Sequence, residues 1–178
     1  MFKYILIFAC ISVFYSDTKT MSWTEDYKLK WSDFKGKPNY NTKAAAVTAA
    51  GLSFKYSVNK RDNQIVAFKA HISADFYPDH SWYKKKEISS HLLAHEQLHF
   101  DITELHARYF RARVAQLKPS NTIVKKLQKV HDSINSALKT MQFKYDDESN
   151  YSINKERQLF WSTYVASALK NQSAFKTP

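Results

Sequence analysis

Glycine is almost absent from this chain of 178 residues, with only Gly36 and Gly51 present. Glycine-rich phosphate loops and dinucleotide-binding fingerprints need several glycines at defined spacings near the start of a helix. The sequence therefore excludes nucleotide binding by either of these routes. Hydrophobic residues make up 44% of the chain and aromatic residues 15%, which is typical of a packed globular protein and argues against disorder. The length allows one domain with one hydrophobic core.

Cysteine occurs once, at Cys10, inside an apolar run from Tyr4 to Tyr15 that follows Lys3. The run is too short to cross a bilayer as a helix and has the pattern of a signal peptide. We therefore predict a signal peptide over residues 1–16, with an open boundary, and a secreted or periplasmic protein without a membrane-spanning segment after its removal. The alternatives are lipidation at Cys10, a cytosolic protein that begins with a buried strand, and a start at Met21.

Removal of the signal peptide leaves a mature chain without a thiol. Disulfide bonds and cysteine ligation of a metal are then both excluded. Any bound metal must be held by His, Asp, Glu or Tyr side chains.

The net charge is strongly positive, +11 at pH 7. Such a balance occurs in proteins that bind nucleic acid, anionic membranes or cell-wall polymers. However, the lysines are scattered, the longest basic run is Lys84–Lys86, and no nucleic-acid-binding motif is recognisable. We attribute the charge to solvated surface and expect no nucleic-acid partner.

The hydrophobic pattern predicts strands in the first half of the chain and helices in the second. Period-two alternation and turn signals indicate strands over 27–31, 44–58 and 65–76, with a hairpin break over 61–64. Helical periodicity follows over 84–116, then in a stripe from Ile123 to Met141 after a cap at Ser120 or Asn121, and finally over 153–169. This order indicates an α+β fold, with a small N-terminal antiparallel sheet packed on about three helices in a single domain over 22–172.

The segment His95-Glu96-Gln97-Leu98-His99 lies in the middle of the first predicted helix. Two histidines four residues apart point the same way, about 6 Å apart along the helix axis, so both can bind one zinc ion. Glu96 lies about 100° around the helix, beside the ion, where a general base can take a proton from a zinc-activated water. Both histidines share the apolar face, where unpaired imidazoles are costly to bury. The alternative is a pair of hydrogen-bonded core histidines, with Glu96 in a salt bridge.

A catalytic zinc ion needs a third protein ligand, which the same helix does not supply. His106 shares the face of His99 but lies about 10 Å further along an unbroken helix. His91 fails for the same reason in the other direction. Asp101 points away from this face and fits a role on the helix surface or behind the ligands better.

Downstream, the third ligand can come from His131 or from the acidic residues of the segment YDDESNY, residues 145–151. We place this segment at a junction between helices, where a carboxylate can be held rigidly. Glu148 is the leading candidate, and His131 and Asp146 remain alternatives. The same residues also fit a core histidine and a solvated loop that caps the last helix. Tyr151 is a candidate hydrogen-bond donor to the oxyanion of a tetrahedral intermediate.

Several segments together resemble a known family. They are LKWSDFKGKP (29–38), Ser81-Trp82, HEQLHFDI (95–102), YDDESNY (145–151), Gln158 and Trp161. The chain resembles the predicted secreted zinc-dependent proteases that are catalogued as a bacterial domain of unknown function. The resemblance implies a zincin-like domain, with zinc on His95 and His99 and Glu96 as the base. Tyr151 stands where the family often has His, and Leu98 where it often has a small residue.

We therefore expect a zinc-dependent hydrolase, a metallopeptidase that cleaves a peptide or protein substrate, with Zn²⁺ as its cofactor. The strand over 65–76 is expected to bind substrate along its edge. The alternative is a non-catalytic envelope binding module with a structural metal or a histidine cluster. A structural metal site is closed by four protein ligands, whereas a catalytic one keeps an open position.

Overall fold

The computed structural model describes residues 20–177, so the predicted signal peptide lies outside the described residues. Within this range the strands are β1 (Met21–Ser22), β2 (Ala46–Val47), β3 (Ala50–Arg61), β4 (Gln64–Phe76) and β5 (Trp82–Tyr83). The helices are α1 (Ser90–Ala115), α2 (Ile123–Ser149) and α3 (Lys155–Asn171). Short 3-10 helices cover Trp31–Asp33, Pro78–His80 and Ser173–Phe175. The expected α+β class, with small antiparallel sheets and three helices, is confirmed.

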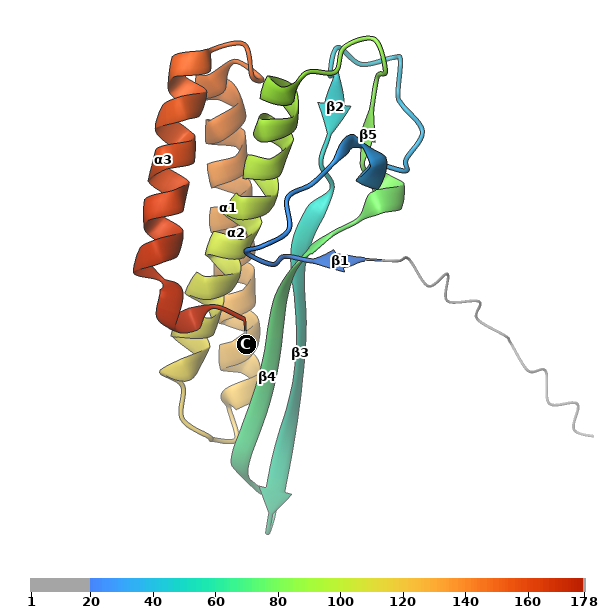
Figure 1. Ribbon diagram of the computed structural model, residues 1–178. Coiled ribbons are helices and arrows are strands. Elements are labelled where there is room, and N and C mark those ends of the chain that lie inside the picture. The colour runs from blue at the N-terminus through green and yellow to red at the C-terminus, as the bar shows by residue number, and fades with distance from the viewer. Residues whose placement is uncertain (1–19, 178) are drawn as a thin grey trace, which may run out of the picture.

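The sheets are built around one long hairpin, which β3 and β4 form. Its turn places Asp62 and Asn63 at φ values of 48° and 60°, the left-handed conformation that a tight hairpin turn requires and that these two residue types tolerate. β1 adds to the far side of β4, giving the strand order β1–β4–β3, and β2 pairs separately with β5. The tip of the hairpin extends past the connection between α1 and α2 (Figure 1), to which Asn121 ties it through Gln64 and the backbone of Ile65.

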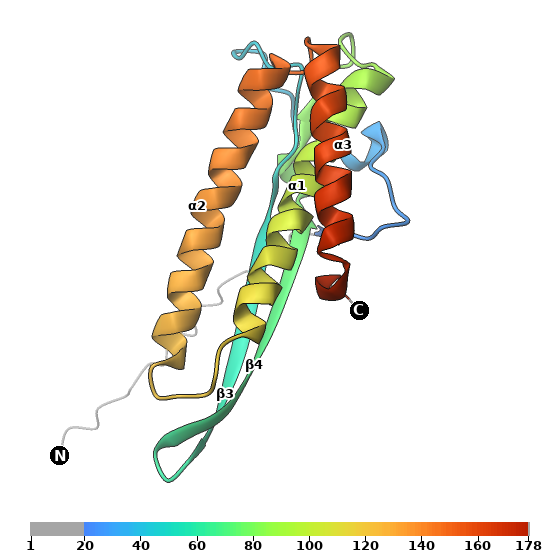
Figure 2. The ribbon, with the colours of Figure 1, turned by 90° about the vertical axis from the view of Figure 1, so that its left-hand side faces the viewer.

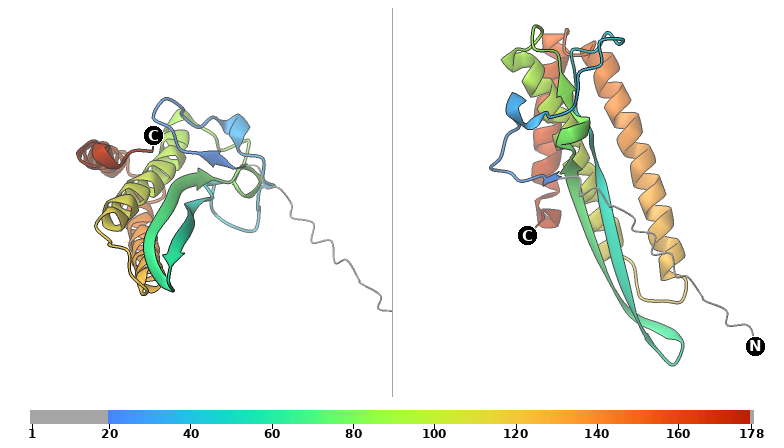
Figure 3. Two further views of the ribbon diagram at one scale, coloured as in Figure 1. Left: turned by 90° about the horizontal axis from the view of Figure 1, so that it is seen from below. Right: turned by 90° about the vertical axis from the view of Figure 1, so that its right-hand side faces the viewer.

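α1 is the central element of the fold. It packs against β4 and β3 on one side and against α2 and α3 on the other, and the helices lie together on one side of the hairpin ribbon (Figures 2 and 3). The larger apolar cluster joins the sheet to α1 and includes Phe76, Phe100, Phe110 and Ile123. The smaller cluster lies among the three helices and consists of Leu98, Ile102, Leu138, Tyr145, Trp161 and Val165. A helix buried on two sides is a rigid support for functional side chains.

The prediction of a strand over 27–31 is wrong. The backbone N–H of Leu29 donates to the Gln97 side chain at 2.7 Å, and that of Lys30 donates to the Asp33 carboxylate at 2.7 Å. Side chains therefore satisfy these backbone groups, and the segment is a loop that ends in a 3-10 helix.

The first helix begins at Ser90 rather than near Lys84, because the Ser89 hydroxyl accepts a hydrogen bond from the N–H of Leu92 at 3.0 Å and caps the helix. The backbone of Lys84 instead donates to the carbonyl of Ala45, beside the β2–β5 pair.

The second helix is longer than predicted and continues through Tyr145, Asp146, Asp147 and Glu148 to Ser149. It ends where Asn150 adopts the left-handed conformation and its N–H bonds to the carbonyls of the preceding turn. The acidic segment is therefore the last turn of a helix and not a loop.

Among residues 20–177, no helix combines the length and the apolar character needed to cross a lipid bilayer.

Candidate metal centre

His95 and His99 lie one turn apart on α1 and face the same neighbour, as the spacing predicts. Their Nε2 atoms are 3.2 Å apart, and the two rings are nearly perpendicular, at 87°. His95 is buried, whereas the side chain of His99 is 14% exposed. Both rings therefore present Nε2 to one point between α1 and α2.

Asp146, on the last turn of α2, completes the group. Its Oδ1 atom lies 2.9 Å from Nε2 of His99 and 3.2 Å from Nε2 of His95. Among the described residues, His95, His99 and Asp146 form a group whose ligand atoms all lie within 4.8 Å of one another. Tetrahedral coordination with bonds of about 2.0–2.2 Å places neighbouring ligand atoms about 3.3–3.6 Å apart. The three side chains thus fit a metal ion after movements of a few tenths of an ångström.

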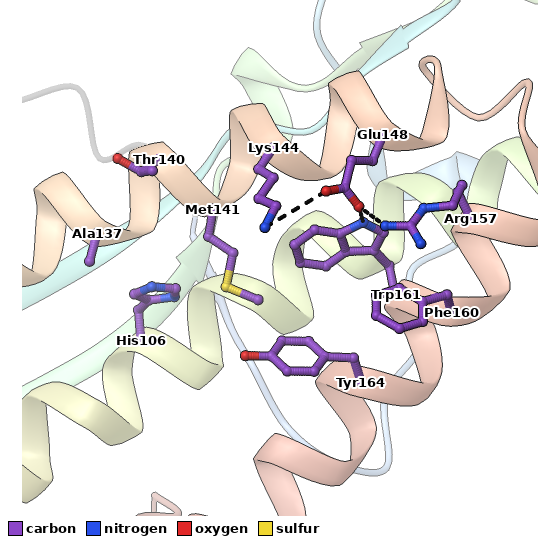
Figure 4. Close-up of a pocket in the computed structure, with 10 residues that line it drawn as sticks. All are labelled: His106, Ala137, Thr140, Met141, Lys144, Glu148, Arg157, Phe160, Trp161 and Tyr164. Carbon is purple, nitrogen blue, oxygen red and sulfur yellow. Dashed lines mark hydrogen bonds and ion pairs between the residues drawn. The ribbon is translucent and has the colours of Figure 1, made fainter.

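Glu148 does not join this group, although the sequence made it the leading candidate. It lies two residues after Asp146 and points to another side of α2, where Trp161 Nε1 donates to it at 3.0 Å and Arg157 and Lys144 pair with it (Figure 4). The Arg157 hydrogen bond holds the pKa of the Glu148 carboxyl below its usual value. The alternative candidate, Asp146, takes the place that was expected of Glu148.

A cavity of about 560 Å³ opens beside Glu148, between α2 and α3. Its walls include Met141, Phe160, Trp161 and Tyr164 (Figure 4). None of the three grouped ligand residues lines it. This cavity is therefore separate from the candidate metal centre.

Residues 26–152 match the family described as "Bacterial protein of unknown function (DUF922)". The chain belongs to this family. No curated protein and no solved structure gives a significant match. The region that matches DUF922 contains the whole His95–His99–Asp146 group, whereas α3 follows it in the chain.

Three further histidines of this DUF922 protein, considered from the sequence as possible ligands, do not belong to the group. The ring of His131 stacks on Phe54 with centroids 5.6 Å apart. His106 contacts the carbonyl of Ile102 through Nδ1 at 2.9 Å, and burial lowers its pKa. His91 contacts the carbonyl of Ser152 through Nε2 at 2.6 Å. The side chain of His131 is 30% exposed, so it is neither a ligand nor a core histidine, and none of the three contributes to the metal group.

Tyr151 lies just beyond α2, at a φ of 52°, and the residue is 68% exposed. Its backbone N–H bonds to the carbonyl of Asp146 at 2.9 Å, so it belongs to the turn that ends the helix carrying the third ligand. Its role toward an oxyanion stays a prediction.

Two residues around the group gave no signal on their own in the sequence. Tyr145 is fully buried, and its ring stacks on His95 at 4.6 Å with 28° between the planes. The Oε1 atom of Gln142 lies 2.5 Å from Nδ1 of His99, and its Nε2 atom donates to the His99 carbonyl at 2.9 Å. Gln142, Tyr145 and Asp146 share one face of α2 by helical spacing, which a correct helix boundary would have indicated.

The electrostatics tie Asp146 to the histidines. Burial acts to raise the pKa of Asp146, but hydrogen bonds and charge from His95 and His99 outweigh it, so this pKa lies below its usual value. Burial acts to lower the pKa of His99, but the hydrogen bond to Asp146 and the charges of Asp146 and Glu96 outweigh it and raise this pKa above its usual value. The site thus favours positive charge between Asp146 and the rings.

Glu96 is buried beside the group without belonging to it. Its charge raises the pKa of His99. The pKa of Tyr145 is raised mainly by burial of the phenol and, next, by the charge of Glu96. Thr48 donates to the backbone carbonyl of Glu96 at 3.2 Å, which places the segment leading into β3 against this part of α1.

The rest of the HEQLHFD string supports the N-terminal segment. Asp101 accepts hydrogen bonds from Nε1 of Trp23 at 2.7 Å and from Gln97 at 2.8 Å. Since Gln97 also accepts from the backbone of Leu29, these two residues anchor the chain around Trp23 and Leu29 to α1. Asp101 therefore supports the helix from the side away from the metal group.

Proposed function

We propose that this protein is a zinc-dependent hydrolase of peptide bonds with a zincin-like arrangement, in which His95, His99 and Asp146 hold the metal. The observation that carries the proposal is the convergence of these three ligand atoms within 4.8 Å from two helices, with Glu96 beside them.

The donor set supports zinc. Two imidazoles and one carboxylate form one of the sets that catalytic zinc sites use, leaving the fourth tetrahedral position free. The described chain has no cysteine to compete for the ion.

Unequal burial supports a catalytic rather than a structural metal. The side chain of His95 is 4% exposed, whereas that of Asp146 is 25% exposed. Solvent therefore approaches the group from the side of Asp146, where a water molecule and a substrate can enter. A structural site would be closed by a fourth protein ligand, and the group within residues 20–177 has three.

A zinc ion held here would supply Lewis acidity to a water molecule and to the substrate carbonyl. In the proposed reaction, the Glu96 carboxylate takes a proton from the attacking water and passes it to the leaving amine. Its place directly after His95, beside the ligands rather than among them, suits this role. The ring of Tyr145 covers His95 and keeps water from the inner side of the site.

The strand expected to bind substrate lies over 65–76. β4, which covers this predicted strand, pairs with β3 along its length and, on its other side, with β1 at Asp75 and Phe76 only. No described strand pairs with the other side of β3, and the segment before β3 contacts Glu96 through Thr48. We therefore propose that an extended peptide adds along the beginning of β3.

The activity of Glu96→Gln against a mixture of peptides tests the proposal. This variant keeps the shape of the side chain and removes the base, so we expect unchanged zinc content and a rate at least about a hundredfold lower than wild type. Glu87→Gln is the matched control, since Glu87 is an exposed partner of Lys84 outside the site, and should retain full activity. Equal rates for wild type and Glu96→Gln, or an inert zinc-loaded wild type, would overturn the proposal.

A further inference from the structure

Gln142 lies one helical turn before Asp146 on α2, and its amide has one allowed orientation. Its Nε2 atom donates to the carbonyl of His99 at 2.9 Å and lies 3.3 Å from the Thr103 hydroxyl. The carbonyl of His99 can only accept, and the Thr103 hydroxyl already donates its hydrogen to this carbonyl at 3.0 Å. The amide nitrogen must therefore face these two groups, and the amide oxygen must face His99 Nδ1.

This orientation determines the tautomer of His99. The Gln142 Oε1 atom lies 2.5 Å from Nδ1 of His99 and can only accept a hydrogen bond. Nδ1 must then carry the proton. In the neutral ring, Nε2 is left with a lone pair that points at Asp146 Oδ1, 2.9 Å away.

We propose that Gln142 is a positioning residue that locks the neutral ring of His99 in the Nδ1–H tautomer, so that its Nε2 is free to bind a cation and donates to Asp146 only when the ring is protonated. The inference rests on the proposed metal-dependent function. Two acceptors that face each other at hydrogen-bond distance repel unless a cation lies between them. Gln142 thus converts a potential histidine–aspartate hydrogen bond into a pair of metal ligands.

His95 lacks such a partner and serves as an internal comparison. Its Nδ1 atom is buried without a hydrogen-bond partner among the described residues, while its Nε2 lies 3.2 Å from Asp146 Oδ1. In the metal-free protein, the neutral ring of His95 carries its proton on Nε2, which donates to Asp146. Metal binding at Nε2 would release this proton to solvent, and the ring would take up one from solvent on Nδ1 and stay neutral. His95 changes tautomer on metal binding, and His99 does not.

Partners behind a metal ligand orient the ring and raise its basicity, and their loss weakens metal binding by about 10–100-fold. We expect a loss of this size in zinc affinity for Gln142→Leu. Gln142→Glu keeps an acceptor opposite Nδ1 but loses the donor to the His99 carbonyl, so it should bind zinc more tightly than Gln142→Leu. Gln128→Leu is the matched control, because Gln128 is an exposed glutamine of the same helix that contacts Asp132.

Long-range ¹⁵N–¹H correlation spectra of the histidine rings test the tautomers directly. In the metal-free wild type, titrated to a pH at which both rings are neutral, we expect Nδ1–H for His99 and Nε2–H for His95. After addition of zinc we expect Nδ1–H for both rings. Zinc affinities of the three variants are measured by competition with a chelator.

An Nε2–H tautomer for His99 in the metal-free protein would overturn the inference. So would a zinc affinity of Gln142→Leu within twofold of wild type. Wild-type protein that does not bind zinc would instead contradict the proposed function, while the metal-free tautomers would still decide the role of Gln142.

Discussion

At the scale of single residues, two acids on the same turn of α2 have different surroundings. Asp146 points to His95 and His99, and Glu148 points to Arg157 and Trp161. Two positions along a helix correspond to about 200° of rotation, so neighbours in the sequence face opposite sides. From the sequence, both acids were candidates for the third metal ligand. The direction in which each side chain leaves the helix distinguishes them.

Asp146→Ala should weaken zinc binding by more than about a hundredfold, because it removes one of three ligands, which costs more than the loss of a supporting partner. Isothermal titration of the metal-free protein with zinc measures this change. Glu148→Gln, the matched control, should bind zinc as wild type does. The reverse order of these two variants would restore Glu148 as the ligand.

Zinc affinity should fall as the pH falls. Zinc needs a neutral His99, and the pKa of this ring is raised above 6.5 by Asp146 and Glu96 against the effect of burial. Protons therefore begin to compete with the metal above pH 6.5, and each bound proton costs about tenfold in affinity per pH unit below the His99 pKa. A zinc affinity that stays constant from pH 8 to about pH 6 would contradict this.

The pKa shifts of His99 and Asp146 also make the stability of the metal-free protein depend on pH, in opposite directions for the two groups. The raised His99 pKa gives stability that is complete below the unfolded value of about 6.5 and is lost as the pH rises through the folded value. The lowered Asp146 pKa gives stability that is present above about pH 4 and is lost in stronger acid.

Urea denaturation with a chelator should therefore show the difference in free energy of unfolding between wild type and Asp146→Asn shrinking as the pH rises above about 6.5. The comparison with this variant removes the opposite contribution of His106, whose pKa burial lowers. A difference that grows over this range would contradict the assignment.

At the scale of elements, the sequence predicted α1 and its histidine pair well because both signals are local. The spacing of His95 and His99 determines their direction on any helix. The end of α2 was predicted wrongly because its last turn is polar in composition. Tyr145 and Ser149 are fully buried in that turn, so packing against the other helices extends the helix beyond its apolar stripe. The third ligand could not be chosen without this boundary.

α1 also carries a buried charge network that should matter for stability. Glu104 is buried and accepts from Arg108 at 2.9 Å and from Arg111 at 3.1 Å. The two arginines also donate to the carbonyls of Leu169 and Phe175, both at 2.7 Å. The network therefore connects α1 to the end of α3 and to the C-terminal segment.

Glu104→Ala leaves the buried Arg108 and the partly buried Arg111 without their carboxylate, and the loss of one partner of a buried ion pair typically costs about 3–5 kcal/mol. Urea denaturation should show a decrease of this size in the free energy of unfolding. Asp132→Ala, which removes an exposed partner of His131, should change the free energy by less than about 0.5 kcal/mol. Equal effects of both variants would mean that the network is not a principal support of α1.

At the scale of the whole molecule, the sheet and the N-terminal segment hold α1 from one side, and α2 and α3 complete the fold on the other. The metal group lies where the first half of α1 meets the end of α2, so its ligands come from rigid helices rather than loops. The α+β class followed from the order of the periodic patterns. The path of residues 23–33 could not be predicted in this way, since it depends on the distant side chains of Gln97 and Asp101.

The position of zinc in crystals of the zinc-loaded protein, located by its anomalous scattering, tests the central claim most directly. The account predicts one ion about 2.0–2.2 Å from Nε2 of His95, Nε2 of His99 and a carboxylate oxygen of Asp146, with the fourth position open to solvent. An ion held by other residues, a fourth protein ligand at this ion, or no anomalous peak at the group would contradict it.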